Sequence, residues 1–119
     1  MEGENGARSI AEMLGKKRGP VYAGRLEIRP ADHAALVDGR PLTLTVRELQ
    51  VLTEFAHNAE RVMTREELFR AVWGREYRPS DRSVDVYIGR LRAKFERALP
   101  GHRFIHTHTG IGYRFSPQH

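Results

Sequence analysis

The sequence predicts a single α+β domain: a small antiparallel sheet, then three helices, then a C-terminal β-hairpin. Three observations support this order. Residues 21–44 alternate apolar and polar side chains in short runs, capping boxes open two helices within residues 45–73, and an amphipathic helix over 81–97 precedes two short strand patterns. The length of 119 residues allows one modest hydrophobic core. We therefore expect one folded domain, at residues 21–116.

Composition narrows the functional class. The chain has no cysteine, which excludes disulfides, thiolate catalysis and cysteine-based zinc sites. It has no run of about 20 apolar residues and no signal-peptide pattern, so we expect a cytoplasmic protein with no membrane partner. The net charge is +5, and residues 61–119 carry twelve Lys/Arg against six Asp/Glu. A basic half beside a nearly neutral half predicts an anionic partner, with nucleic acid as the leading candidate.

Residues 1–20 are expected to form a flexible tail or linker, because they are rich in glycine and poor in large apolar side chains. Within this segment, residues 9–14 have the spacing of a capping box and carry an apolar trio. A short docking helix is therefore the alternative interpretation of that stretch.

An antiparallel sheet of three or four short strands is predicted over residues 21–44. Apolar and charged residues alternate at 25–29, as in a half-buried strand. Two further apolar runs, at 35–37 and 42–44, are separated by Asp38-Gly39, a dipeptide typical of two-residue hairpin turns. We expect these two runs to pair with each other.

Capping boxes predict the next two helices. The first box, at residues 45–48, opens a helix that ends near Asn58. The second box, at residues 64–67, opens a helix that stops at Gly74. The residues expected to face the core are Leu49, Leu52, Phe55 and Ala56 in the first helix and Leu68, Ala71 and Val72 in the second.

A third helix is predicted over residues 81–97, after Pro79, with Ser80 or Asp81 as its N-cap, and before Pro100-Gly101. It divides into an apolar stripe and an opposite face that combines arginines with small side chains. Small side chains let the helix axis approach a polyanion while arginines reach phosphates or guanine edges. A solvated amphipathic surface helix is the alternative. The expected core stripe is Val84, Ile88, Leu91 and Phe95, and the opposite face is Arg82, Val86, Gly89, Arg90, Ala93 and Arg97.

A β-hairpin closes the predicted domain, with strands at 104–107 and 112–115 and a turn containing Thr109-Gly110-Ile111. A hairpin placed after a helix-turn-helix is a wing. His106 and His108 share one strand face, where they could hold a metal or lie near nucleic acid; we favour the second and predict no metal site. The sequence shows no nucleophile-base spacing and no glycine-rich phosphate cradle, so we expect no enzyme, no cofactor and no small-molecule substrate.

Five short motifs stand in order along the chain. They are Leu44-Thr45 followed by Arg47-Glu48-Leu49, then Val72-Trp73-Gly74, then Arg82-Ser83-Val84-Asp85-Val86-Tyr87-Ile88, then Arg90-Leu91-Arg92, and finally Gly110-Ile111-Gly112-Tyr113-Arg114. Together, from about Val21 to Phe115, they resemble the effector domain of OmpR/PhoB-type response regulators, a winged-helix family. The order and spacing of the five motifs carry this resemblance, rather than any one of them.

The resemblance implies a winged helix-turn-helix that lays its third helix in the major groove of promoter DNA and touches an adjacent minor groove with its wing. It makes Arg90 the expected reader of a base edge. Bases are expected within van der Waals distance of Ser83, Asp85 and Val86, and phosphates or the backbone near Arg82, Tyr87, Arg92, Thr107 and Trp73. The full expected DNA-binding set is Trp73, Arg82, Ser83, Asp85, Val86, Tyr87, Arg90, Arg92, Lys94, Thr107, Thr109 and Arg114.

The resemblance also implies partners. RNA polymerase, through its sigma or alpha subunit, is expected to contact the loop before the third helix, and a plain spacer is the alternative interpretation of that loop. The implied contact residues are Arg75, Glu76, Tyr77 and Arg78. A homodimer on direct repeats of double-stranded promoter DNA is also implied, which would be nucleoid-associated in a bacterial cytoplasm.

Three features depart from the family pattern. Gly89 stands where relatives often carry a long polar residue, and His108-Thr109 stands where they commonly carry Val-Arg, so the wing lacks its minor-groove arginine. No receiver domain is visible before the sheet, so we expect an excised effector domain or a freestanding regulator. These departures leave a second hypothesis open: a winged-helix adaptor that binds RNA polymerase or a sigma factor and touches DNA weakly and without sequence preference.

Overall fold

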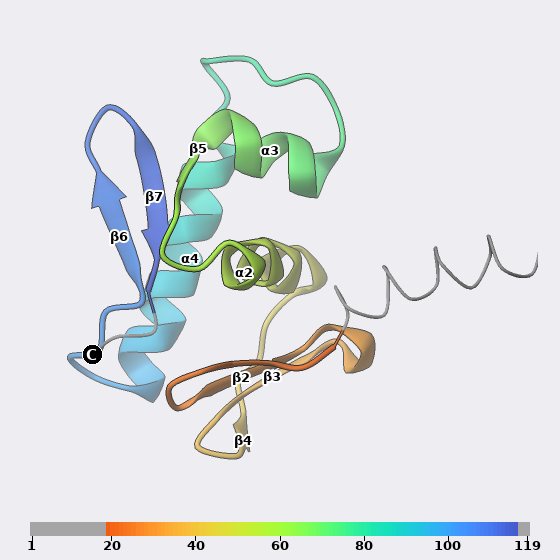
Figure 1. Ribbon diagram of the computed structural model, residues 1–119, viewed down its shortest axis with the longest axis vertical. Coiled ribbons are helices and arrows are strands. Elements are labelled where there is room, and N and C mark those ends of the chain that lie inside the picture. Colours follow the sequence, from red (N-terminus) through yellow and green to blue (C-terminus); the bar gives the residue numbers. More distant parts are fainter. Residues whose placement is uncertain (1–18, 117–119) are drawn as a thin grey trace, which may run out of the picture.

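The computed structural model describes residues 19–116, whose elements follow the expected order of sheet, helices and hairpin (Figure 1). The expected α+β fold is confirmed. The tail predicted at 1–20 and its alternative docking helix at 9–14 lie outside the described residues, apart from Gly19 and Pro20. The elements are β1 (Val21–Ala23), β2 (Leu26–Arg29), the 3-10 turn η1 (Pro30–Asp32), β3 (Ala34–Val37), β4 (Arg40–Pro41), α2 (Val46–His57), β5 (Val62–Thr64), α3 (Arg65–Trp73), α4 (Ser83–Ala98), β6 (Ile105–His108) and β7 (Gly112–Phe115).

The N-terminal sheet has four antiparallel strands in the order β1-β2-β3-β4. Asp38 and Gly39 join β3 to β4 with positive φ angles of 52° and 77°, as a two-residue hairpin turn requires. The partner of β3 is Arg40–Pro41, and of the predicted run at 42–44 only Leu42 extends this pairing, with its N–H donating to the Ala35 carbonyl at 2.8 Å. The prediction holds for Leu42 alone, because Thr43 and Leu44 lead from the sheet to α2, and both leucines of the run pack against the core.

Both predicted capping boxes are present. Thr45 Oγ1 accepts a hydrogen bond from the Glu48 backbone N–H at 3.1 Å, and Thr64 Oγ1 accepts one from that of Glu67 at 3.0 Å. Helix α2 ends at the predicted Asn58, and α3 ends at Gly74, whose φ of 68° is left-handed. All four residues expected to face the core from α2 are buried.

The core face of α3 differs from the prediction in one respect. Leu68 and Phe69 are its buried residues, while Ala71 is exposed and Val72 is only half-buried. The reason is aromatic packing, since the Phe69 ring buries more apolar surface than Ala71 and stacks on Trp73 with centroids 5.1 Å apart.

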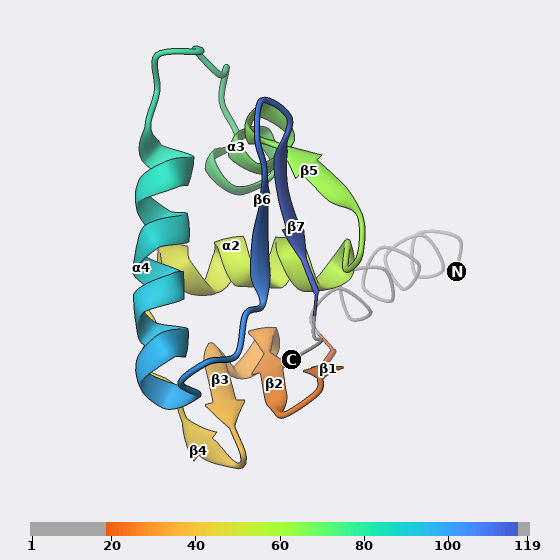
Figure 2. The same cartoon turned by 90° about the vertical axis from the view of Figure 1, so that its left-hand side faces the viewer.

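Helix α4 buries the predicted stripe of Val84, Ile88, Leu91 and Phe95. It begins at Ser83, two residues later than predicted. Asp81 still supplies a capping hydrogen bond, because its Oδ1 accepts a 2.8 Å hydrogen bond from the N–H of Ser83, the first residue of the helix. Figure 2 shows α4 running along one side of the molecule, beside the hairpin of β6 and β7 and across α2.

The C-terminal sheet has the order β5-β7-β6, and its strands are antiparallel. Strand β5 was not predicted, and β6 begins at Ile105, one residue later than expected. Gly112 opens β7 so close to β5 that a Cβ there would lie 2.0 Å from the carbonyl oxygen of Met63. Glycine at this motif position is therefore required by strand packing. Within residues 19–116, no helix is long and apolar enough to cross a membrane.

Candidate nucleic-acid interface

One face of α4 is turned entirely to solvent. Val86 keeps 46% of its surface exposed although it is apolar, and a Cβ on Gly89 would have nothing within 4 Å. The guanidinium of Arg90 lies 4.9 Å from the Tyr87 ring centroid, which holds this arginine beside the exposed face. The six residues predicted for this face are all exposed: Arg82, Val86, Gly89, Arg90, Ala93 and Arg97. The face thus offers a narrow ridge with cations along it.

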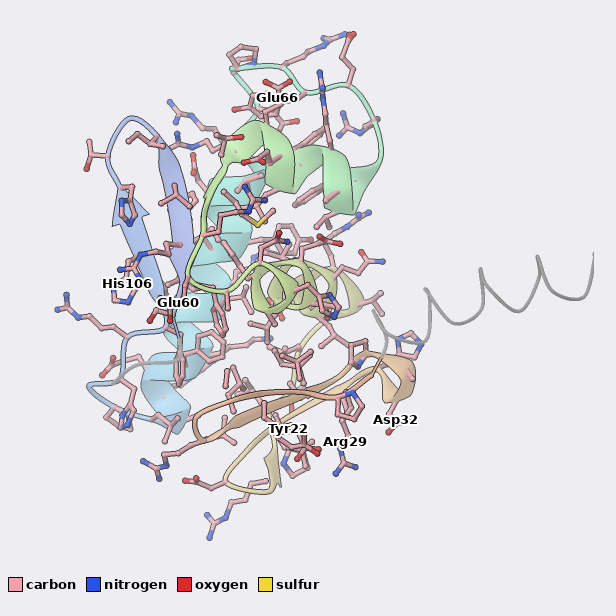
Figure 3. The ribbon with its side chains drawn as sticks, viewed as in Figure 1. Tyr22, Arg29, Asp32, Glu60, Glu66 and His106 are labelled. Carbon is pink, nitrogen blue, oxygen red and sulfur yellow. The ribbon has the colours of Figure 1, made fainter. Side chains whose placement is uncertain are left out.

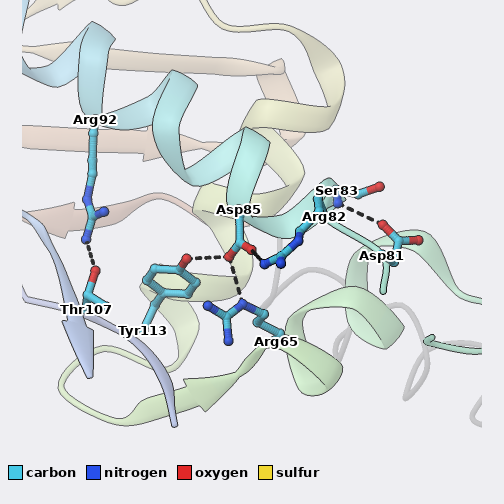
Figure 4. Close-up of polar contacts among 8 residues, drawn as sticks. All are labelled: Arg65, Asp81, Arg82, Ser83, Asp85, Arg92, Thr107 and Tyr113. Atoms are coloured by element: carbon cyan, nitrogen blue, oxygen red, sulfur yellow. Dashed lines mark hydrogen bonds and ion pairs between the residues drawn. The ribbon is translucent and has the colours of Figure 1, made fainter. Parts of the chain in front are cut away.

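Asp85 lies at the start of α4 and joins three elements (Figure 4). Its Oδ1 accepts hydrogen bonds from Arg65 Nε of α3, at 2.8 Å, and from the Tyr113 hydroxyl of β7. Arg82 Nη1 is 3.5 Å from the other carboxylate oxygen. Burial opposes ionisation of this carboxyl, but the bonds from Tyr113 and Arg65 outweigh burial and hold the pKa of Asp85 below its ordinary value. The carboxylate thereby sets how α4 sits against α3 and the wing.

Arg92 and Thr107 tie α4 to the wing. Arg92 Nη2 donates to Thr107 Oγ1 at 2.7 Å and to the Ile105 carbonyl at 3.0 Å. Both acceptors are neutral, so the positive charge of Arg92 is not cancelled by an ion pair with any carboxylate in residues 19–116. These two predicted phosphate contacts are adjacent in space, although they lie far apart in the chain.

The wing tip itself carries no cation. Thr109 and Ile111 are exposed at the turn, Ile111 by 59%. Arg114, a predicted DNA contact, is bound to Glu60 through Nη1 at 3.0 Å and to His108 Nε2 through Nε at 3.2 Å. The guanidinium is therefore held beside Glu60, which lies in the turn between α2 and β5 and supplies a counter-charge.

The predicted histidines lie near these charges. His106 pairs with Arg114 across the β6–β7 ladder, and Figure 3 shows its ring on the outer side of the wing. Burial, with the charges of Arg114 and Arg92, lowers the pKa of His106 from its ordinary value. Among the described residues, no group of three histidine, aspartate or glutamate side chains could hold a metal ion.

Lys94, another predicted DNA contact, is bound to protein on the flank of α4. Its Nζ donates to Glu48 Oε1 at 2.6 Å and to the Thr43 carbonyl at 2.8 Å. Glu48 is only 2% exposed, and although its burial opposes ionisation, Lys94 and Thr45 hold its pKa below the ordinary value. This ion pair fastens α4 to the start of α2.

The loop between α3 and α4 is anchored at one end by aromatic packing. Tyr77 packs on Phe69 with centroids 5.5 Å apart, and the guanidinium of Arg75 lies 4.8 Å from the same ring. Glu76 and Arg78 are exposed. Trp73 packs edge-on against Tyr87 and is half-buried where α3 meets α4. The predicted polymerase-contact residues thus form a surface loop next to the arginine face.

Sequence reasoning missed the partners that position these residues. Arg65 and Tyr113 meet Asp85 from 20 and 28 residues away in the chain, and Lys94 meets Glu48 from 46 residues away. Periodicity and capping describe only neighbours along the chain, so neither could reveal such contacts. The remaining predicted residue, Ser83, is half-buried at the first turn of α4. The roles of all these residues toward DNA stay predictions.

Comparison with known families gives a match over most of the chain. The family described as "Transcriptional regulatory protein, C terminal" matches residues 39–115. The phosphate regulon transcriptional regulatory protein PhoB of Klebsiella pneumoniae is 40% identical over 92 residues, which cover 76% of this chain and 39% of that protein. The uncharacterized transcriptional regulatory protein YcbL of Bacillus subtilis is 40% identical over 81 residues, covering 68% and 36%. This chain spans about two-fifths of the length of these relatives.

Solved structures agree with this match. The Klebsiella pneumoniae RstA DNA-binding domain, solved in complex with the RstA box, has a TM-score of 0.76 and 32% identity, covering 84% of this chain and 99% of that one. The DNA-binding domain of CpxR from E. coli has a TM-score of 0.74 and 31% identity, covering 82% and 95%. Both similarities extend over nearly the whole described domain.

Proposed function

The chain belongs to the family of C-terminal domains of transcriptional regulatory proteins, of the OmpR/PhoB type, and on this premise we propose that it binds double-stranded promoter DNA as a bacterial transcription regulator. Helix α4 enters the major groove. The observation that carries the proposal is the division of α4 into a buried stripe and an exposed face with Arg82, Arg90 and Arg97 around Gly89.

Contacts to bases and to phosphates divide between two groups of residues. Arg90, with Val86 beside it, reads base edges. An arginine can form two hydrogen bonds to one guanine, and such a pair discriminates against a wrong base by about 1–3 kcal/mol. Arg82, Arg92 and Thr107 bind phosphates, which set register and supply affinity without sequence choice. Asp85 accepts hydrogen bonds from Arg65 and Tyr113. These bonds fix the position of α4 and so orient it for the contacts to DNA.

Further partners follow from the loop and from the family. The exposed Glu76 and Arg78 of the loop before α4 contact RNA polymerase, in its sigma or alpha subunit, while Tyr77 anchors the loop to α3. Two copies bind side by side on direct repeats, which places equivalent α4 helices in the major groove about one helical turn apart.

Selection from a randomised duplex library at fixed salt, followed by sequencing, tests the function. We expect enrichment of a short motif, repeated at about one helical turn of 10–10.5 base pairs. A parallel selection with Arg90→Ala should enrich a motif with one relaxed position. Uniform weak recovery from the unaltered chain would instead favour the adaptor hypothesis, in which α4 does not choose a sequence.

A further inference from the structure

Arg40 and Arg97 line one groove at the C-terminal end of α4. The groove has a volume of about 620 Å³ and lies between the β3–β4 hairpin and the last turn of the helix. Both side chains are exposed, and within residues 19–116 neither guanidinium has a hydrogen bond or an ion pair. The other lining residues are Arg25, Val37, Asp38, Pro41, Leu42 and Ala98.

The one carboxylate among these lining residues is already paired. Asp38 accepts hydrogen bonds from Arg25 through both of its oxygens, Nε to Oδ1 at 2.8 Å. The bond from Arg25, with a contribution from the charge of Arg40, holds the pKa of Asp38 below its ordinary value, so the carboxylate stays ionised with Arg25 as its partner. The groove therefore carries the positive charges of Arg40 and Arg97, and no ion pair within residues 19–116 cancels them.

The position of this groove follows from the geometry of α4. Arg97 lies on the same exposed face as Arg90 and seven residues further on, which is about 10 Å along a helix that rises 1.5 Å per residue. The major groove of B-DNA is about 12 Å wide. When α4 crosses the groove with Arg90 against a base edge, Arg97 comes to the groove wall, where the phosphates are. In Figure 2 the β3–β4 hairpin lies close to this end of α4, and Arg40 is the first residue of β4.

We propose that Arg40 and Arg97 together hold a backbone phosphate of the bound duplex, so that the N-terminal sheet takes part in DNA binding. The inference rests on the proposed function of α4. A guanidinium offers a planar set of donors that matches the oxygens of a phosphodiester. The contact would also offset the missing cation at the wing tip, where Thr109 and Ile111 are exposed.

Salt-dependent binding to a non-specific duplex of about three helical turns tests the proposal, because phosphate contacts do not depend on sequence. The slope of log K against log salt should fall by about 0.9 units in Arg40→Ala/Arg97→Ala. The double variant Arg40→Lys/Arg97→Lys keeps both charges and should retain the slope. Circular dichroism confirms folding, which these exposed positions should not disturb.

A matched control removes the same charge elsewhere. Arg29→Ala/Arg70→Ala takes away two exposed arginines that are paired with Glu27 and Glu66, and Figure 3 shows Arg29 on the outer face of the N-terminal sheet. This control should leave the slope nearly unchanged. An equal fall in both double variants would overturn the proposal, since net charge alone would then explain it.

Two other results are decisive. If Arg40→Ala/Arg97→Ala keeps the full slope while Arg82→Ala lowers it, the phosphate contact at the hairpin is refuted and DNA binding by α4 stands. If the unaltered chain shows no salt-dependent binding to any duplex, the proposed function and this inference are both refuted.

Discussion

Arg65 and Asp85 join the first turns of α3 and α4, with Arg65 Nε donating a 2.8 Å hydrogen bond to Asp85 Oδ1. Tyr113 of the wing donates to the same oxygen, so two helices and a strand meet on one carboxylate. The proposed base-reading residue Arg90 lies little more than one helical turn beyond Asp85. The orientation of the recognition face therefore depends on an anion that is itself held by protein.

Asp85→Asn should lower the free energy of unfolding by about 1–3 kcal/mol, because Arg65 and Tyr113 lose a charged acceptor. Urea denaturation measures the change. Glu66→Gln is the matched control: it breaks an exposed ion pair with Arg70 on α3, worth about 0.5 kcal/mol or less. A loss in Asp85→Asn no greater than in the control would contradict the role assigned to this carboxylate.

Stability should decline in acid through Asp85 and Glu48. Both have a pKa that is lower in the folded chain than in the unfolded one, so their contribution is complete above the unfolded values of about 4 and is lost as pH falls through the folded values. Unfolding followed from pH 6 to pH 2 checks this.

Glu48→Gln isolates the contribution of Glu48. Glutamine can keep the capping-box bond to the Thr45 N–H but leaves Lys94 without its counter-ion, so we expect a loss of about 2 kcal/mol or more at neutral pH. The same variant should show a shallower decline in acid. A decline as steep as that of the unaltered chain would show that Glu48 titrates without affecting the fold.

Gly89→Ala should have opposite effects on stability and on binding. The new methyl group meets nothing within 4 Å, and alanine favours a helix by about 0.5–1 kcal/mol, so thermal denaturation should show a midpoint several degrees higher. Affinity for DNA should fall, because the helix axis can no longer approach as closely. Gln50→Ala, on the exposed side of α2, is the control and should leave affinity unchanged. Unchanged affinity in Gly89→Ala would place the closest approach elsewhere.

Arg90→Ala and Arg82→Ala should affect DNA binding in different ways: the first changes base preference and the second changes overall affinity. Loss of Arg90 relaxes preference at one base pair, worth about 1–3 kcal/mol of discrimination. Loss of Arg82, whose side chain is 78% exposed, weakens binding to all sequences alike and lowers the salt slope by about one unit. Titrations of a selected and a scrambled duplex at several salt concentrations distinguish the two outcomes. Full preference retained by Arg90→Ala would reassign base reading to another residue.

Local signals located the helices well and the strands less well. The boxes at Thr45 and Thr64 marked the helix starts because a capping hydrogen bond forms within four residues. The apolar run at 42–44 resembled a strand, yet only its Leu42 extends the short pair at Arg40–Pro41. Strand β5 escaped prediction because three residues carry too little periodicity, and its pairing with β7 supplies its stability.

The sequence by itself determined the order of elements, the buried stripe of α4 and the arginine face opposite, since these depend on spacing within one helix. Only the tertiary structure decided which of the charged side chains remain available. It binds Asp85 to Arg65, Lys94 to Glu48 and Arg114 to Glu60, and it gives Arg40 and Arg97, beside one groove, no ion-pair partner among residues 19–116. The physical reason is that a charge is matched by whatever the fold brings within a few ångströms, and those partners come from distant parts of the chain.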